Sequence, residues 1–295
     1  MRVPLPEGIA SPRFQAQLEE ARSLRDALQT TSRTATLNTM GLLREHVFED
    51  WTDSIEQLGL ELASLLNLHC PLDLLHTKIP EFDAGIKSHP HVMKAKTALL
   101  HPLMDATRAA PFRAAYDALI LRHVVPHLSD AGDANGECLL TSQAGKEELF
   151  YACLPTLRVQ TPSEEVATIR PHVDGMYGLP EGSINFWVPL TPVSSTAALW
   201  TESSPGAEDF HPLTRPTRFD GRRCIHFSVP NRSERTRVSI DFRCVPGALH
   251  DPRDRLSRAG YYASMQKVDS TFQPHVQGHV SKLHGLPHKA QPLTL

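Results

Sequence analysis

The sequence lacks several features that would assign it directly to a class of protein. No apolar run approaches the ~20 residues that a membrane-spanning helix needs. The N-terminal stretch MRVPLPEGIASPRF contains no continuous apolar segment of the kind found in a secretory signal. Basic residues are not in excess, because 30 Lys and Arg stand against 33 Asp and Glu, for a net charge of −3. Electrostatic binding to nucleic acid normally needs a basic excess, so we expect neither a membrane nor a nucleic-acid partner.

Cysteine is scarce and shows no pattern. The chain has five cysteines, an odd number, and no two of them form a CxxC pair. A disulfide framework is therefore not indicated, and we expect reduced and mostly buried thiols in a cytoplasmic protein.

The first part of the chain has apolar residues at helical spacing. Ser11 is a suitable N-cap and Pro12 a suitable first helical residue. A later helical stretch is expected to break near Pro111 and to end at Pro126. The predicted helices lie at residues 11–31, 51–68 and, as two helices, 92–128.

From Cys138 onward the apolar pattern changes to a period of two, which is typical of strands. Predicted strands lie at residues 157–162, 183–191, 197–203, 223–229 and 236–245. Helices followed by short strands predict an α+β fold in which a jelly-roll core carries the site. We expect one integrated domain with three regions, and its helical half is a candidate homodimer interface. The regions are a helical part packed on the outer sheet face (1–135), the core (136–250) and a loop-rich tail with one short helix near 253–265 (251–295).

One short motif within the strand region carries possible chemistry. His172 and Asp174 stand two residues apart in a strand-like segment, so their side chains would point to the same face. Such a pair arises about once by chance in a chain of this composition, and alone it would indicate a surface hydrogen bond. His226, in the stretch RCIHFSV, is the third group that could complete a metal site.

The strand expected after His226 carries an arginine that could lie close to this histidine. If the turn PNRSE joins two strands as a hairpin centred near Asn231 and Arg232, His226 would face Arg237. Alternation divides the second strand into a polar face with Arg237, Ser239, Asp241 and Arg243, and an apolar face with Val238, Ile240 and Phe242. The apolar face is suited to packing under the helices.

These residue types fit one kind of chemistry. Two histidines and one carboxylate leave three coordination positions open, as in non-haem Fe(II) oxygenases. Those positions can accept a bidentate 2-oxoacid and then O2. The distal carboxylate of a dicarboxylate co-substrate needs a fixed cation, and Arg237 with the Ser239 hydroxyl would supply it.

The set His172-x-Asp174, His226 and Arg237-x-Ser239 resembles the Fe(II)/2-oxoglutarate-dependent dioxygenases in order and spacing. The surrounding text, including HVDGMYGLPEGSINFWVPLT and NRSERTRVSIDFRCVP, is similar to a bacterial branch of streptomycin-biosynthesis-type proteins related to the phytanoyl-CoA hydroxylase-like enzymes. The resemblance covers about residues 150–247 and implies a double-stranded β-helix core.

The resemblance also implies a role for each matched residue. His172, Asp174 and His226 would hold Fe(II), while Arg237 and Ser239 would hold 2-oxoglutarate. The activity implied is hydroxylation of an unactivated C–H bond with O2, releasing succinate and CO2. The substrate would be a small molecule such as an amino acid or a natural-product intermediate.

Five further residues are candidate substrate contacts, each of which could instead be a polar group satisfied within the core. They are Asn185, Trp187, Arg158, Gln160 and Tyr177. Arg243 has the correct parity to replace Arg237 as the co-substrate ligand, whereas Arg235 is expected to be exposed.

Two rival functions stay open at this point. A cupin-like jelly roll could bind a ligand or isomerise a sugar without redox chemistry, and it would not need Arg237. An oxygenase of the same fold could catalyse desaturation or cyclisation, or act on a protein side chain.

Overall fold

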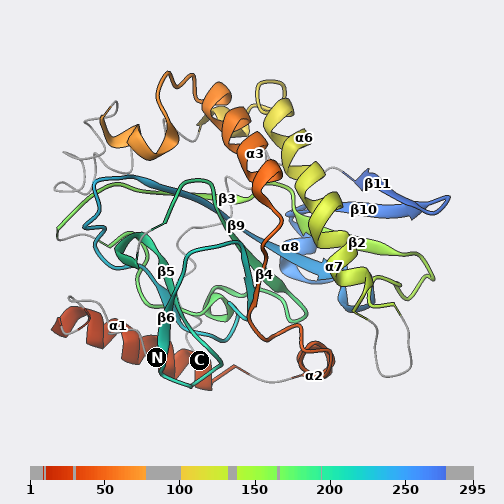
Figure 1. The fold of residues 1–295 in the computed structure, drawn as a ribbon. Helices are drawn as coiled ribbons and strands as arrows, with labels where there is room; N and C mark the ends of the chain where they lie inside the picture. Colours follow the sequence, from red (N-terminus) through yellow and green to blue (C-terminus); the bar gives the residue numbers. More distant parts are fainter. Residues whose placement is uncertain are drawn as a thin grey trace.

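The computed structural model describes residues 9, 11–28, 31–77, 101–131, 138–164, 167–193 and 195–276. Helices and antiparallel strands are mixed, and the strands form one eight-stranded and one three-stranded sheet (Figure 1). The expected mixture of helices with antiparallel sheet is therefore confirmed, whereas closure into a double-stranded β-helix stays a prediction. No described helix combines the length and apolar character that crossing a bilayer requires.

Two of the helices predicted from periodicity are present. In α1, the Ser11 hydroxyl accepts a hydrogen bond from the Phe14 amide at 3.2 Å, and Pro12 occupies the first turn. The helix predicted at 51–68 is present as α3. The helices are α1 (Pro12–Asp26), α2 (Ser32–Thr39), α3 (Thr52–Leu65), α6 (Ala110–Leu119), α7 (Val125–Ser129) and α8 (Arg255–Arg258).

The prediction that a helix ends at Pro126 is wrong. α6 continues through a π-helical turn, Ile120–Val124, into α7, and Pro126 lies in the first turn of α7. Proline has no N–H and its ring clashes with the carbonyl four residues earlier. The π turn widens the helix at this point, and the Val125 N–H bonds to the Ile120 carbonyl instead. Part of the first helix predicted within 92–128 lies outside the described residues.

Strand β9 organises the larger sheet, which has the order β1-β7-β4-β9-β2-β10-β11. β4 pairs along one edge of β9, and β3 and β2 pair in succession along the other. The smaller sheet has the order β6-β5-β8. The strands are β1 (His46–Val47), β2 (Glu148–Ala152), β3 (Thr156–Gln160), β4 (Ile184–Pro189), β5 (Leu199–Glu202), β6 (Phe210–Leu213), β7 (Thr217–Phe219), β8 (His226–Phe227), β9 (Arg237–Pro246), β10 (Tyr262–Val268) and β11 (Thr271–Val276).

Helices α3 and α6 pack against the apolar face of β9 in the larger sheet. Val238, Ile240 and Phe242 lie in the same buried cluster as residues of α3 and α6. The Phe242 ring stacks on Phe186 of β4 at 5.2 Å and meets Tyr116 of α6 edge-on at 5.4 Å. α1 differs from the arrangement expected for the helical part, because it packs on the smaller sheet beside β5 and β6 (Figure 1).

The predicted hairpin between the strands of His226 and Arg237 is wrong. β8 pairs with β5, where Thr201 is the partner of His226, and β9 pairs with β3, where Gln160 is the partner of Arg237. The two strands belong to different sheets. The polar residues between them form local hydrogen bonds, such as Ser233 Oγ to Asn231 Oδ1, and shape a connection between sheets instead of a tight turn.

The loop-rich structure predicted for 251–295 is also wrong where the structure describes it. β10 and β11 form a hairpin, and β10 pairs with β2 in the larger sheet. Most of β10 is buried on both faces, so its sequence lacks the alternation from which a strand is recognised. The predicted short helix is limited to α8. Residues 277–295 lie outside the described residues, and the division into three regions stays a prediction.

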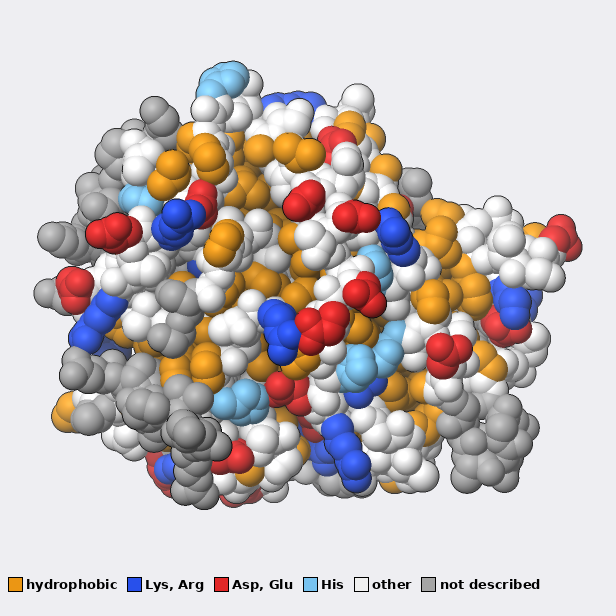
Figure 2. Space-filling model, viewed as in Figure 1, with side chains coloured by type: hydrophobic (Ala, Val, Ile, Leu, Met, Phe, Trp, Pro, Cys, Tyr) orange, Lys and Arg blue, Asp and Glu red, His pale blue; other side chains and the backbone are white. Residues whose placement is uncertain are grey.

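Charges of both signs are mixed on the surface. Acidic and basic side chains alternate over the face shown in Figure 2, without a continuous basic patch on that face. Exposed ion pairs of this kind, such as Arg215 with Glu49, contribute at most about 1 kcal/mol each to the free energy of unfolding.

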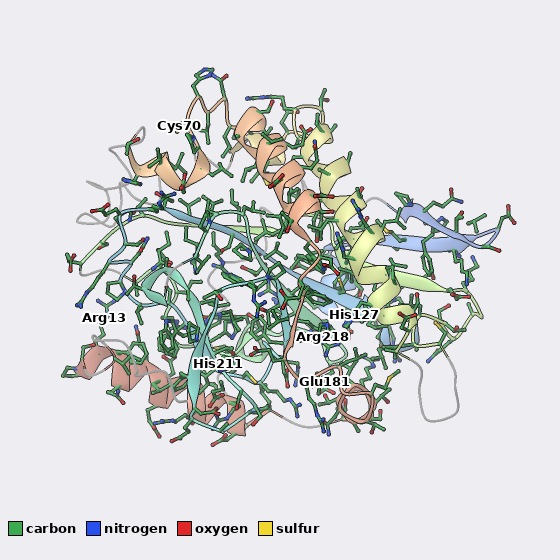
Figure 3. All side chains as sticks on the ribbon, viewed as in Figure 1. Arg13, Cys70, His127, Glu181, His211 and Arg218 are labelled. Carbon is green, nitrogen blue, oxygen red and sulfur yellow. The ribbon has the colours of Figure 1, made fainter. Side chains whose placement is uncertain are left out.

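A buried cation beside a histidine makes the fold sensitive to acid. Arg218 of β7 donates to Nε2 of His127 at 2.7 Å and to the carbonyls of Gly41 and Arg44 (Figure 3). Burial, followed by the charges of Arg218 and His46, lowers the pKa of His127 to about 4, from its ordinary value of 6.5. As the pH falls, His127 is therefore protonated at a higher pH in the unfolded chain than in the folded protein.

We expect this contact to stabilise the fold fully above about pH 6.5 and to be lost progressively as the pH falls towards 4. His127→Gln keeps an acceptor for Arg218 but does not titrate. The free energy of unfolding of this variant, measured by urea denaturation, should fall less steeply between pH 6.5 and 4 than that of the wild type. Identical slopes would contradict the assignment.

Candidate metal centre

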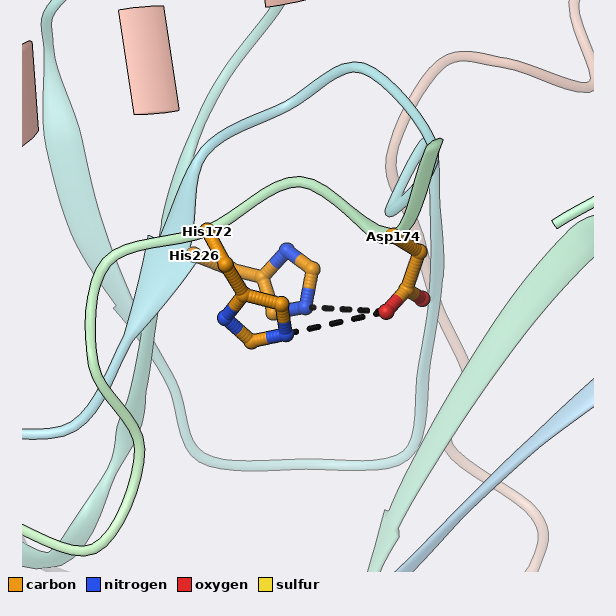
Figure 4. A group of neighbouring side chains, drawn as sticks. All are labelled: His172, Asp174 and His226. Atoms are coloured by element: carbon orange, nitrogen blue, oxygen red, sulfur yellow. Dashed lines mark ion pairs between the residues drawn. The ribbon is translucent and has the colours of Figure 1, made fainter. Parts of the chain in front are cut away.

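His172, Asp174 and His226 come together in the interior (Figure 4). Nε2 of His172 lies 3.6 Å from Asp174 Oδ1, and Nε2 of His226 lies 3.9 Å from the same oxygen. All three side chains are buried, and one potential ligand atom from each lies within 4.8 Å of the others. The convergence predicted from sequence is confirmed.

The backbone holds the three residues in place by extending the smaller sheet. His172 and His226 form an antiparallel bridge, with N–H to O distances of 3.2 and 2.9 Å. Asp174 begins a short 3-10 turn, Asp174–Tyr177, and its amide donates to the Gly221 carbonyl at 2.8 Å. The bridge places both imidazoles on one side, which the spacing of the two residues could not predict.

Both imidazoles are oriented for binding a cation. Nδ1 of His172 bonds the Arg170 carbonyl at 2.8 Å, and Nδ1 of His226 bonds the Cys224 carbonyl at 3.0 Å. Each Nδ1 is therefore the protonated nitrogen, and each Nε2 presents its lone pair to the centre. Burial, followed by the neighbouring His172, lowers the pKa of His226 to about 3, so this ring is neutral at neutral pH.

Asp174 supplies the negative charge. Burial raises the pKa of its carboxyl, but the nearby positive charge of Arg243 lowers it. The pKa is held well below its ordinary value, and the group is a carboxylate. Oδ2 accepts from Arg243 at 2.8 Å and from Asn185, whereas Oδ1 faces the histidines.

This donor set fits a divalent transition metal. Two imidazole nitrogens and one carboxylate oxygen form a three-residue face that leaves further coordination positions open. It is the only group of three or more His, Cys, Asp or Glu side chains with this proximity in the part of the chain that the structure describes.

Arg237 and Ser239 are buried without partners. Both residues are 0% exposed, and among the described residues no hydrogen-bond partner reaches the three guanidinium nitrogens of Arg237 or the hydroxyl of Ser239. Burial, followed by the charge of Arg158 and opposed by Asp241, lowers the pKa of Arg237 to about 9. A buried cation without a hydrogen-bond partner is costly to fold, so its burial here needs an explanation.

Arg237 and Ser239 share a face of β9 with Asp241 and Arg243. Arg243 forms an ion pair with Asp174, one of the three candidate metal ligands. The face of β9 that carries Arg237 is therefore the face directed towards these ligands. Arg243 itself forms ion pairs with Asp174 and Asp241 and is not the reserve co-substrate ligand considered above.

The candidate substrate contacts have differing environments. Arg158 forms an ion pair with Asp241 at 2.8 Å, and Tyr177 lies 5.5 Å from the His172 ring. Gln160 donates to the Val229 carbonyl at 2.6 Å. Within the described part of the chain, its buried Oε1 and the buried Nε1 of Trp187 have no hydrogen-bond partner. Contact of these residues with a substrate stays a prediction.

Asn185 has a partner that was not anticipated. Its amide nitrogen donates to Asp174 Oδ2, and both groups are buried. The interaction of Arg243 with Asp174 was also missed from sequence. Alternation along β9 does place Arg243 on the same face as Arg237 and Ser239. It does not show which other segment of the chain lies against that face.

The fold and the cluster together define a class: a mixed helical and antiparallel-sheet protein with a buried two-histidine, one-carboxylate centre. This is the ligand pattern of non-haem iron oxygenases. No protein-family model matches the chain.

A curated relative is the streptomycin biosynthesis protein StrG of Streptomyces griseus, with 35% identity over 111 residues. The match covers 38% of this chain and 54% of the relative, so the chain spans about half the length of that protein. Over this stretch the chain is similar to a protein named for streptomycin biosynthesis, in agreement with the motifs in its sequence. The relation to phytanoyl-CoA hydroxylase-like enzymes stays a prediction.

Two solved structures show a weaker likeness. The nickel complex of the non-haem monooxygenase ThoJ is 13% identical, with 86% of this chain and 93% of that chain covered and a TM-score of 0.34. The non-haem α-ketoglutarate-dependent epimerase SnoN from nogalamycin biosynthesis is 12% identical, with 90% and 95% covered and a TM-score of 0.33. TM-scores at this level do not establish a common fold.

Replacing one of the three candidate ligands tests the metal centre. We expect His226→Ala to weaken the binding of a divalent transition metal by more than about 100-fold, since removal of an outer hydrogen-bond partner of a ligand already costs 10- to 100-fold. The measurement is equilibrium dialysis of Co(II), with circular dichroism as a check on folding. His211→Ala is the control, because His211 bonds Glu45 and is not in the cluster. Unchanged affinity in folded His226→Ala would contradict the assignment.

Proposed function

We propose that this protein is a non-haem Fe(II)/2-oxoglutarate-dependent oxygenase that hydroxylates a small molecule. One observation carries the proposal beyond a generic metal site. Arg237 is a fully buried cation without a hydrogen-bond partner among the described residues, it has the unpaired Ser239 hydroxyl beside it, and both lie on the β9 face directed towards the cluster. A dicarboxylate that chelates the metal through one end would neutralise Arg237 with the other.

Each residue has a defined part in this proposal. His172, Asp174 and His226 would hold Fe(II) on one face and leave the opposite face to ligands. The guanidinium of Arg237 would donate two parallel hydrogen bonds to the distal carboxylate of 2-oxoglutarate, and Ser239 would donate a third. When bound, Fe(II), 2-oxoglutarate and O2 supply the oxidation of an unactivated C–H bond, with release of succinate and CO2.

The proposed substrate is a natural-product intermediate. The similarity to StrG, named for streptomycin biosynthesis, supports this class, although it covers only about half of that protein. A ligand-binding or isomerising jelly roll without redox chemistry gives no reason to bury Arg237 without a partner. Desaturation or cyclisation would use the same residues and is distinguished by the product.

Arg237→Met should change stability and co-substrate binding in opposite directions. Removing an unsatisfied buried cation should raise the free energy of unfolding by about 1–3 kcal/mol. The same change should weaken 2-oxoglutarate binding to the Mn(II)-loaded protein by about 2–5 kcal/mol, because one partner of a buried charge pair is lost. Urea denaturation and calorimetric titration measure the two effects.

Arg235→Ala is the matched control, because Arg235 is largely exposed and pairs with Asp73. It should leave 2-oxoglutarate binding nearly unchanged. If Arg237→Met binds 2-oxoglutarate as tightly as the wild type, the co-substrate assignment is wrong.

The activity itself is tested by incubating the Fe(II)-loaded protein aerobically with 2-oxoglutarate and a panel of small metabolites. We expect a substrate to stimulate succinate release and to yield a product heavier by one oxygen atom. A product of unchanged mass formed without 2-oxoglutarate consumption would support the isomerase alternative, and loss of two hydrogens would indicate desaturation or cyclisation.

A further inference from the structure

The two oxygens of Asp174 have different surroundings. Oδ1 faces Nε2 of both histidines at 3.6 and 3.9 Å. Oδ2 accepts two hydrogen bonds, one from the Nη2 of Arg243 at 2.8 Å and one from the amide of Asn185. These donors occupy the lone pairs of Oδ2, so only Oδ1 is available to a cation.

Arg243 is itself fixed from the opposite side. Its Nη1 donates to Asp241 Oδ1 at 2.7 Å, and Asp241 Oδ2 accepts from Nε of Arg158 at 2.8 Å. Asp174, Arg243, Asp241 and Arg158 thus form a series of side chains with alternating charge, which begins at the candidate metal ligands. Exposure of the side chains rises along the series from 3% at Asp174 and 9% at Arg243 to 13% at Asp241 and 28% at Arg158. The guanidinium of Arg243 has little freedom to leave Asp174.

A glycine leaves room for Asn185 beside Asp174. A Cβ atom at Gly221 would clash with the amide of Asn185, with its Cγ only 2.7 Å away, so the Asn185 side chain would have to shift. The carbonyl of the same glycine accepts the hydrogen bond from the Asp174 backbone amide. Gly221 therefore allows the side chain of Asn185 and the backbone of Asp174 to share one narrow space.

We propose that Arg243 and Asn185 are positioning residues that hold Asp174 as a single-oxygen metal ligand. By occupying Oδ2 they prevent the carboxylate from rotating or binding through both oxygens. A second carboxylate contact would fill a coordination position that a co-substrate or O2 needs. The inference rests on the metal centre of the proposed function and assigns neither residue a contact with substrate.

Co(II) binding to the metal-free protein tests this role without measuring turnover. Wild-type protein should bind Co(II) with visible ligand-field bands, which respond to the number of ligands. Asn185→Ala and Arg243→Met should each lower the affinity by about 10- to 100-fold, as expected for partners of a metal ligand. Both variants should also change the visible bands, because Oδ2 becomes free to coordinate.

Arg218→Met is the matched control. Arg218 is as buried as Arg243, but it lies on β7, where it bonds His127 and the carbonyls of Gly41 and Arg44. This variant should lose stability in thermal unfolding and yet keep the Co(II) affinity and spectrum of the wild type. If Arg243→Met does not fold, Asn185→Ala carries the test alone, since it removes one donor and leaves every charge in place.

The possible failures are distinguishable. If wild-type protein binds no Co(II), the metal centre of the proposed function is wrong. If the wild type binds Co(II), and folded Asn185→Ala and Arg243→Met bind it equally well with the same spectrum, the positioning role is overturned while the metal centre stands. A loss of affinity in Arg218→Met as large as in Arg243→Met would also overturn it, because a general loss of stability would then account for the effect.

Discussion

The buried ion pair between Asp174 and Arg243 connects the two sheets of this protein. Asp174 follows the bridge that extends the smaller sheet, and Arg243 lies on β9 in the centre of the larger sheet. Removing one partner of such a pair commonly costs about 3–5 kcal/mol, because the other charge stays buried and uncompensated. The relative position of the sheets and the orientation of the candidate metal ligand therefore depend on the same contact.

Arg243 and Arg237, both on β9, differ in how their positive charges are balanced by neighbouring side chains. Arg243 and Arg158 are each matched by an aspartate, and Asp241 lies between them. Arg237 has no acidic partner within the described residues and keeps its buried charge. This difference between the two cations is the observation on which the proposed co-substrate site rests.

Helices α3 and α6 support the centre, and neither supplies one of its three candidate ligands. α3 and α6 pack on the apolar face of β9, while the opposite face carries the charged residues. Alternation along one strand thus separates the hydrophobic core, which stabilises the fold, from the polar interior, where the candidate chemistry lies. Asn185 and Phe186, adjacent on β4, show the same division: the amide contacts Asp174 and the ring stacks on Phe242.

The sequence by itself determined the elements whose signals are local. Periodicity predicted α1, α3 and the polar and apolar faces of β9, and residue chemistry selected His172, Asp174 and His226. Only the tertiary structure decided which strands pair: β8 joins β5 instead of β9, and β10 completes the larger sheet. Strand pairing depends on contacts between residues far apart in the chain, so the pattern of one strand predicts a face but not its neighbour. For the same reason the sequence placed Arg237 and Arg243 on one face of the strand, with Arg237 as the expected co-substrate ligand and Arg243 in reserve. Only the packing of the sheets matched Arg243 to Asp174 and left Arg237 without a hydrogen-bond partner among the described residues.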